Sequence, residues 1–134
     1  MINKFSLLEF MIHPDFVHVQ GPNEVPDAPG VYILFDPVGQ MIYVGKGNLK
    51  NRISLHYSHN EPNPDIRELF EYMVFQQTAT VEQAEMMEGK IYDEYCTAYR
   101  LPPAANHIRP PEATYGMDID ELYDRLNLKL DSVL

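Results

Sequence analysis

Residues 30–52 read GVYILFDPVGQMIYVGKGNLKNR, and the rest of the chain is organised around this stretch. Two runs rich in β-branched and aromatic residues, Val31–Phe35 and Met41–Val44, are separated by the turn-forming segment Asp36–Gln40. This pattern predicts a β-hairpin. Asn48 follows a glycine-containing corner and predicts the start of a helix, because its side-chain oxygen can accept a hydrogen bond from a backbone N–H of the first turn.

Four side chains that could take part in catalysis fall on this hairpin and helix. Tyr32 and Tyr43 lie one on each predicted strand, and Arg52 and His56 lie four residues apart on the predicted helix. Residues four apart share one face of a helix. A guanidinium, an imidazole and two phenols at one corner favour a site that processes phosphate groups.

A long helix is predicted over residues 79–99, with Thr80 as its cap and Gln83 completing a capping box. Its apolar residues recur at helical spacing and predict the inward face: Ala84, Met87, Ile91, Tyr95 and Ala98. Glu88 falls within this stripe, where a carboxylate is costly to bury without a partner. Glu88 is therefore a candidate metal ligand. The alternatives are an ion pair with Arg52, or Glu85, one turn earlier, as the ligand.

Gly30-Val31-Tyr32 and Tyr43-Val44-Gly45, followed by Arg52, resemble the motifs of the GIY-YIG nuclease family. This family includes homing endonucleases, some restriction enzymes and the incision domain of bacterial excision repair. The later residues His56, Glu88 and Asn106 also match positions of that family, so the resemblance covers residues 29–108.

The resemblance implies an α/β (α+β) fold with a small, mainly antiparallel three-stranded sheet flanked by helices, residues 73–75 supplying the third strand. It also implies roles for particular residues. Glu88 would bind one Mg²⁺ or Mn²⁺, and Arg52 would bind the phosphate. Tyr32 is the first choice of base and Tyr43 the second. The full set of expected catalytic residues is Tyr32, Tyr43, Arg52, His56, Glu88 and Asn106, with Lys46, Lys50 and Arg109 expected to contact nucleic acid.

The length of 134 residues predicts a single domain. We expect an N-terminal extension over residues 1–29, a catalytic core over 30–108 and a C-terminal helical extension over 109–134. Phe5, Leu8 and Ile12 predict a short helix that begins near Ser6 and packs on the domain. Further apolar residues at helical spacing predict a last helix over residues 117–130, with Ile119, Leu122, Leu126 and Leu130 facing inward.

The net charge of −10 is unusual for a protein that binds nucleic acid, because phosphate contacts need basic side chains. The exception is residues 30–58, which contain three basic residues, Lys46, Lys50 and Arg52, and only one acidic residue, Asp36. The single cysteine, Cys96, is typical of a reducing compartment, and the sequence has no apolar segment long enough to span a membrane and no signal peptide. We therefore expect a cytoplasmic protein.

The sequence as a whole predicts a metal-dependent endonuclease that hydrolyses phosphodiester bonds in nucleic acid, with DNA as the expected substrate. The alternative is a catalytically silent binding module, or a regulatory subunit, that keeps the GIY-YIG fold. A zinc site at His56 and His59 is a further alternative, but no second pair of ligands at a recognisable spacing completes it. We expect a monomer or a weak homodimer.

Overall fold

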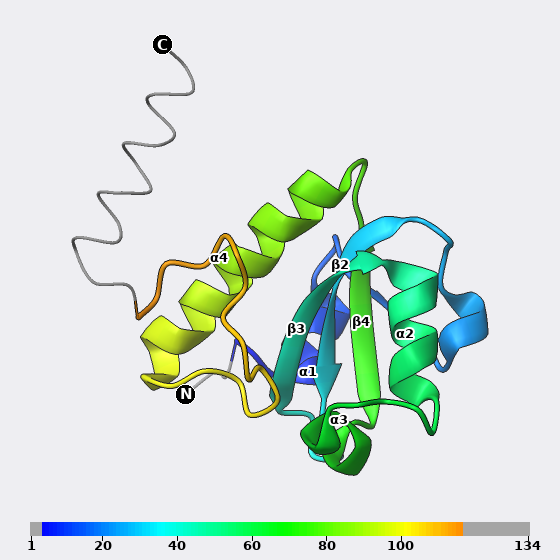
Figure 1. Cartoon of the computed structure of the whole chain (residues 1–134), viewed down its shortest axis with the longest axis horizontal. Helices are drawn as coiled ribbons and strands as arrows, with labels where there is room; N and C mark the ends of the chain where they lie inside the picture. Colours follow the sequence, from blue (N-terminus) through cyan, green and yellow to red (C-terminus); the bar gives the residue numbers. More distant parts are fainter. Residues whose placement is uncertain (1–3, 117–134) are drawn as a thin grey trace.

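A four-stranded antiparallel sheet forms the centre of the molecule (Figure 1). The computed structural model of the chain describes residues 4–116. The strands lie in the order β1-β4-β2-β3, and their bounds are β1 (Val17–His18), β2 (Pro29–Phe35), β3 (Met41–Asn48) and β4 (Tyr72–Gln77). The fold class is thus the predicted one, with the additional strand β1 paired to β4 at one edge.

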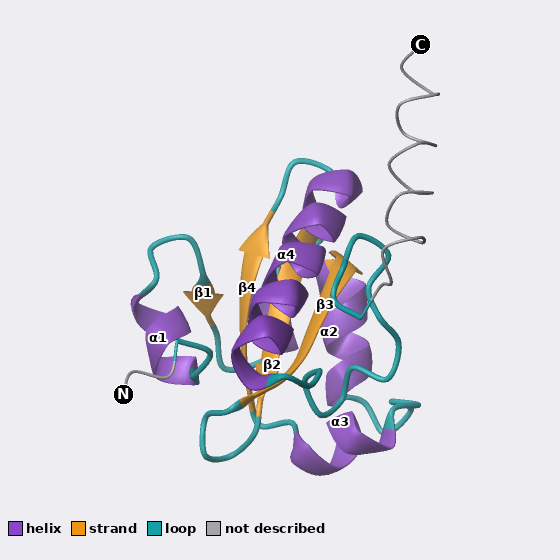
Figure 2. Cartoon of the chain, turned by 90° about the vertical axis from the view of Figure 1, so that its left-hand side faces the viewer, coloured by secondary structure: helices purple, strands orange, loops and turns teal. Residues whose placement is uncertain are grey.

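Helices cover both faces of the sheet (Figure 2). The long helix α4 (Val81–Tyr99) packs against β2 and β3 on one face, where α1 (Leu7–Ile12) packs against β4. On the other face lie α2 (Leu49–Tyr57), α3 (Pro64–Leu69) and a short 3-10 helix, η1 (Pro22–Glu24). Alternate residues of β2 face the two layers, since Ile33 belongs to the core under α4 while Tyr32 and Leu34 belong to the core under α2.

The two glycines of the predicted motif allow close packing at the start of the hairpin. A Cβ on Gly30 would lie 2.5 Å from the carbonyl oxygen of Gln76 on β4. A Cβ on Gly45 would lie 2.5 Å from the phenol oxygen of Tyr32 and 2.7 Å from the Tyr43 ring. Any larger residue at either position would displace these groups. The motif glycines therefore permit β4 and the two phenols to come close to the hairpin backbone.

The predicted helix starts are confirmed by side-chain hydrogen bonds. Asn48 Oδ1 accepts the backbone N–H of Asn51 at 2.9 Å, which caps α2. Thr80 Oγ1 accepts the N–H of Gln83 at 3.1 Å, and the Gln83 side chain accepts the N–H of Ala79 at 3.0 Å, which caps α4. These local interactions fix the directions of the two helices that carry the candidate site residues.

The packing of α1 differs from the sequence prediction. Ser6 caps this helix and Phe5 is buried, but Leu8 and Ile12 are 69% and 71% exposed. Phe10 is the residue of α1 that packs inward, with ring centroids 5.0 Å from Phe16 and 5.8 Å from Phe35. Aromatic contacts with residues outside the helix therefore decide which face of this short helix is buried.

The predicted last helix over residues 117–130 lies outside the described residues. Within residues 4–116, no helix combines the length and the apolar character that crossing a bilayer requires.

Candidate active site

The hairpin, α4 and the segment after α4 bring most of the predicted site residues to one cavity of about 450 Å³ beside the outer edge of β3. Tyr43 and Lys46 come from β3, and Glu88 reaches the cavity from α4. Asn106 and Arg109 come from the segment that follows α4. A carboxylate, two cations and a phenol thus line the same hollow, although they lie up to 66 residues apart in the sequence.

Glu88 lies in the cavity wall with only 6% of its surface exposed. Its Oε1 atom is buried and has no hydrogen-bond partner within residues 4–116. Burial raises the pKa of this carboxyl group to about 7, with a smaller rise from Glu85, while Lys46 and Arg52 act in the opposite direction. An unpaired buried carboxylate oxygen is costly in a folded protein. A cation bound at this point would remove that cost.

Glu85, the alternative metal ligand, has a partner of its own. Lys46 Nζ donates to Glu85 Oε1 at 3.0 Å, and both side chains are partly exposed. This ion pair connects β3 to α4 one turn before Glu88. Because Glu85 is neutralised by Lys46 and Glu88 is not, the geometry favours Glu88 as the ligand.

The two tyrosines differ in their access to the cavity. Tyr43 is half-buried and lines the cavity, whereas Tyr32 is 1% exposed and lies behind it. Their ring centroids are 6.1 Å apart, so the two rings are neighbours. Burial is the largest cause that raises the pKa of each phenol. Tyr43 is thus the phenol that faces the cavity, and the choice of Tyr32 or Tyr43 as the base stays a prediction.

His56 lies on the inner side of Tyr32, and its Nε2 atom is 2.7 Å from the Tyr32 phenol oxygen. The Nδ1 atom of the same imidazole is 2.6 Å from Glu61 Oε2. Burial lowers the pKa of His56, while Glu61 acts to raise it. Glu61 was not predictable as a functional residue from the sequence, because it lies in the turn-rich connection between α2 and α3, where an acidic residue has no periodic pattern to mark it.

Asn106 attaches the segment after α4 to the free edge of β3. Its Oδ1 accepts the N–H of Val44 at 2.9 Å, and its Nδ2 donates to the Val44 carbonyl oxygen at 3.0 Å. The neighbouring N–H of Ala105 donates to the Ile42 carbonyl oxygen at 2.8 Å. The amide thus replaces a paired strand at this point and holds the cavity wall beside Tyr43.

Of the remaining predicted cations, Arg52 and Lys50 lie outside the cavity lining, whereas Arg109 belongs to it. Arg52 is exposed on α2, where its charge lowers the pKa of both tyrosines and of Glu88. Lys50 is exposed on the same helix. Arg109 lines the cavity and donates to the Tyr115 carbonyl oxygen at 3.4 Å. Within residues 4–116, none of these three cations forms an ion pair with Glu88.

The donor set fits Mg²⁺ or Mn²⁺ better than zinc. Magnesium commonly keeps several water ligands and is held by one or two carboxylates. Glu88 can provide such a carboxylate, because its Oε1 atom has no hydrogen-bond partner within residues 4–116. No group of three or more His, Cys, Asp or Glu residues that could hold a metal occurs in residues 4–116. The zinc alternative at His56 and His59 is not supported, because the His56 ring nitrogens are both engaged, by Tyr32 and by Glu61.

Comparison with known proteins identifies the class to which this fold and site belong. The model of the UvrC-like GIY-YIG domain matches residues 28–95. The UvrABC system protein C of Caldicellulosiruptor saccharolyticus is 34% identical over 84 residues, which are 58% of this chain and 14% of that protein. The protein of the same name from Clostridium perfringens is 32% identical over 116 residues, which are 80% of this chain and 18% of that protein.

A solved structure has a similar fold over part of the chain. It is the GIY-YIG N-terminal endonuclease domain of UvrC from Thermotoga maritima, bound to its catalytic divalent cation, magnesium. The similarity has a TM-score of 0.50 and 25% sequence identity, and it covers 63% of this chain and 90% of that domain. The chain belongs to the GIY-YIG nuclease family, with a domain of the UvrC-like kind. It spans less than a fifth of the length of the UvrC relatives named above.

Proposed function

We propose that the chain is a divalent-metal-dependent endonuclease that hydrolyses phosphodiester bonds in DNA. The observation that carries this proposal is the buried Oε1 of Glu88, which has no hydrogen-bond partner among residues 4–116 and lies in the wall of a cavity that Lys46 and Tyr43 also line. The endonuclease domain of Thermotoga maritima UvrC, a protein of the same fold with bound magnesium, supports both the reaction and the metal.

Glu88 would hold the metal through its carboxylate, with water molecules completing the coordination. When bound, Mg²⁺ or Mn²⁺ would neutralise charge on the phosphate and stabilise the leaving oxygen. The raised pKa of Glu88 means that the metal-free carboxyl is protonated over part of the neutral range. Binding of a cation would displace that proton, because only the ionised carboxylate is a good ligand.

Arg52 and Lys46 would bind the substrate phosphate. The planar guanidinium of Arg52 can donate two parallel hydrogen bonds to phosphate oxygens, and its exposed position on α2 leaves these donors accessible. Lys46 is held at the cavity wall by Glu85, so its ammonium group is oriented before substrate arrives. Lys50 and Arg109 would extend the contact along the nucleic-acid backbone on either side.

Tyr43 would accept a proton from the attacking water, because it is the phenol that faces the cavity. Its burial raises its pKa, so it carries its own proton at neutral pH and must pass that proton on as it receives the new one. Tyr32 lies directly behind it and provides the next acceptor. The pair thus moves a proton away from the water without forming a free phenolate.

Cleavage of supercoiled plasmid tests this proposal. The purified chain is incubated with plasmid in Mg²⁺ or Mn²⁺ and in EDTA, and the products are separated on a gel. Glu88→Ala should abolish the metal-dependent cutting while the far-UV circular dichroism spectrum stays unchanged. Glu82→Ala is the matched control, because this exposed acid of the same helix lies outside the cavity.

Two results would contradict the proposal. Glu88→Ala cutting as fast as the wild type would remove Glu88 from the metal site and leave Glu85 as the candidate. Wild-type protein that retains plasmid in a gel-shift assay but never cuts it would support the silent binding module instead.

A further inference from the structure

A second carboxylate, Glu61, is buried close to the candidate active site. It is 3% exposed, and both of its oxygens accept hydrogen bonds. Oε2 pairs with His56 Nδ1 at 2.6 Å, and Oε1 accepts the backbone N–H of Asn63 at 3.0 Å. Asn63 in turn caps α3 and donates to the Ala105 carbonyl oxygen at 2.8 Å, beside Asn106. Glu61 is therefore rigidly held from two sides and aimed at the imidazole.

The hydrogen bond to Glu61 determines which nitrogen of His56 carries the proton. An ionised carboxylate can only accept, so His56 Nδ1 must donate to it. In the neutral imidazole, Nε2 is then left as an acceptor, and the Tyr32 hydroxyl must donate to it across 2.7 Å. The hydroxyl oxygen of Tyr32 keeps its lone pairs for the other side, where Tyr43 lies. The hydrogen bonds thus run in one direction, with Tyr32 donating to His56 and His56 donating to Glu61.

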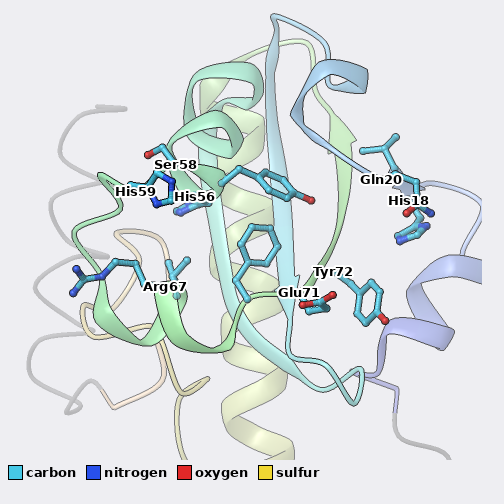
Figure 3. A pocket seen from close by; sticks show the side chains of 12 residues that line it. His18, Gln20, His56, Ser58, His59, Arg67, Glu71 and Tyr72 are labelled. Carbon is cyan, nitrogen blue, oxygen red and sulfur yellow. The ribbon is translucent and has the colours of Figure 1, made fainter.

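The inner end of this chain of hydrogen bonds reaches a separate cavity. His56 lines a hollow of about 520 Å³ on the α2 side of the molecule, bounded by α2, α3 and the strands β1 and β4. Figure 3 shows His56, Ser58 and His59 on one side of this hollow and His18 and Gln20 across from them. Its wall is largely polar. The imidazole therefore lies between the buried phenol and a space that solvent can enter.

We infer that Glu61 and His56 form the terminal proton acceptor of the site: His56 takes the Tyr32 proton during hydrolysis, and Glu61 positions the imidazole and stabilises its charged form. The inference rests on the proposed function. His56 is the group that exchanges the proton, and Glu61 acts through His56 as a positioning residue. The second cavity provides the path by which the proton leaves.

Three protons move in this step, one from the attacking water and one from each of the two phenols. As the water oxygen bonds to phosphorus, one water proton moves to the Tyr43 oxygen, the Tyr43 proton moves to the Tyr32 oxygen, and the Tyr32 proton moves to His56 Nε2. The phosphorus bond to the leaving oxygen breaks, and that oxygen keeps the electron pair and takes a proton from solvent. The imidazolium then returns its proton to water in the second cavity. No oxidant or further reactant is needed.

The first test observes His56 in the metal-free wild-type chain without DNA. Correlation of ring nitrogens with ring protons by NMR identifies the tautomer of each of the five histidines, and His56→Ala assigns the signal of interest. We expect a protonated Nδ1 and an unprotonated Nε2 at neutral pH. A neutral His56 with its proton on Nε2 would overturn the inference, because Tyr32 would then have to accept rather than donate.

The second test is chemical rescue of plasmid cleavage. His56→Ala should lower kcat about 100-fold and leave KM for DNA within about threefold, in line with the usual effect of losing a general base. Imidazole added in solution should restore kcat at least tenfold, whereas pyrazole, a ring of the same size and much weaker basicity, should not. Equal restoration by both compounds would mean that the ring only fills space, which would overturn the inference.

Glu61→Gln keeps the shape of the side chain and an oxygen that can accept from Nδ1, but it removes the charge. We expect kcat to fall at least tenfold while the NMR tautomer of His56 is retained. This variant decides the question if His56→Ala melts at too low a temperature to assay. His59→Ala, which removes another imidazole of the same cavity, should cut at the wild-type rate. A wild-type rate in Glu61→Gln would overturn this inference alone, whereas absence of cleavage by the wild type would overturn the proposed function and this role with it.

Discussion

Glu61 and Glu88 are both buried carboxylates, but they differ in what surrounds them. Both oxygens of Glu61 accept hydrogen bonds, whereas Oε1 of Glu88 has no partner within residues 4–116. A fully satisfied buried acid fixes the groups around it. A buried acid without a hydrogen-bond partner lowers the stability of the folded state, and a bound ligand can remove that cost. The position of Glu88 in an apolar stripe made it predictable from the sequence. Glu61 was not, because its burial depends on the fold of the loop around it.

The pKa of Glu88 predicts how the stability of the metal-free protein changes with pH. The folded-state pKa of about 7 lies above the ordinary value of 4.5. The folded state therefore binds this proton more tightly than the unfolded state does, and the resulting stability is present below about pH 4.5 and lost as the pH rises through about 7. The loss from this one group is at most about 3 kcal/mol.

Urea unfolding of the wild type and of Glu88→Gln, measured in EDTA at several pH values between 4 and 8, checks this prediction. The wild type should lose stability relative to the variant as the pH rises. Addition of Mg²⁺ at pH 8 should stabilise the wild type and leave the variant unchanged. If the difference between the two proteins is the same at pH 4 and pH 8, Glu88 does not titrate as described.

Cleavage activity should be more sensitive to a conservative substitution of Arg52 than to the same substitution of other exposed arginines. Arg52→Lys keeps the charge but loses the planar pair of donors, so we expect kcat for plasmid cleavage to fall about 100-fold or more. The free energy of unfolding should change by less than about 0.5 kcal/mol, because the side chain is exposed. Arg67→Lys on α3 is the matched control. Equal turnover numbers for wild type and Arg52→Lys would mean that Arg52 acts only as a point charge.

Among the described helices and strands, β3 contributes most to the candidate site. It carries Tyr43, Gly45 and Lys46, its free edge binds Asn106, and it leads directly into α2 at the capping residue Asn48. The hairpin and both helix caps depend on neighbouring residues, which is why the sequence predicted them. The attachment of Asn106 to Val44 joins residues 62 positions apart, and only the family resemblance indicated Asn106 as a site residue.

Gly45→Ala tests whether β3 positions the two phenols. The added Cβ would lie 2.5 Å from the Tyr32 phenol and 2.7 Å from the Tyr43 ring, so both rings must move. We expect a loss of stability of about 1–3 kcal/mol, as in other overpacked cores, together with a large fall in kcat. Urea unfolding and plasmid cleavage measure the two effects.

Gly21→Ala is a matched control for this substitution, because a Cβ there would meet nothing within 4 Å. It should leave stability and cleavage close to the wild-type values. If Gly45→Ala is as stable and as active as Gly21→Ala, the phenols do not depend on the close approach of the β3 backbone.

For the whole molecule, the sequence predicted the layers of the fold better than the packing of its surface elements. Local patterns were sufficient for the hairpin, for α2 and for α4. They were not sufficient for the orientation of α1, which is set by contacts of Phe10 with Phe16 and Phe35. The strand β1 was missed as a member of the sheet because two residues carry too little periodicity, and its pairing with β4 joins residues far apart in sequence.

Leu8, Met11 and Ile12 form an exposed apolar strip on α1. These three side chains make a small patch, well below the area of a stable protein interface. The proposed site has one carboxylate ligand, Glu88, so we expect each chain to act on one strand at a time. These observations predict a monomer or weak dimer at micromolar concentration.

Such a protein should convert supercoiled plasmid to the nicked form before linear DNA accumulates. Two independent visits are needed to break both strands, so the nicked form should rise, reach a maximum and then fall as linear product forms. Its maximum should not depend on protein concentration, because each nick is made by a single chain. Light scattering gives the mass of the protein under the same buffer conditions, and Leu8→Glu combined with Ile12→Glu should change neither result. A stable dimer that produces linear DNA without a nicked intermediate, and that the double substitution converts to a nicking monomer, would show instead that α1 is the interface through which two active sites act together.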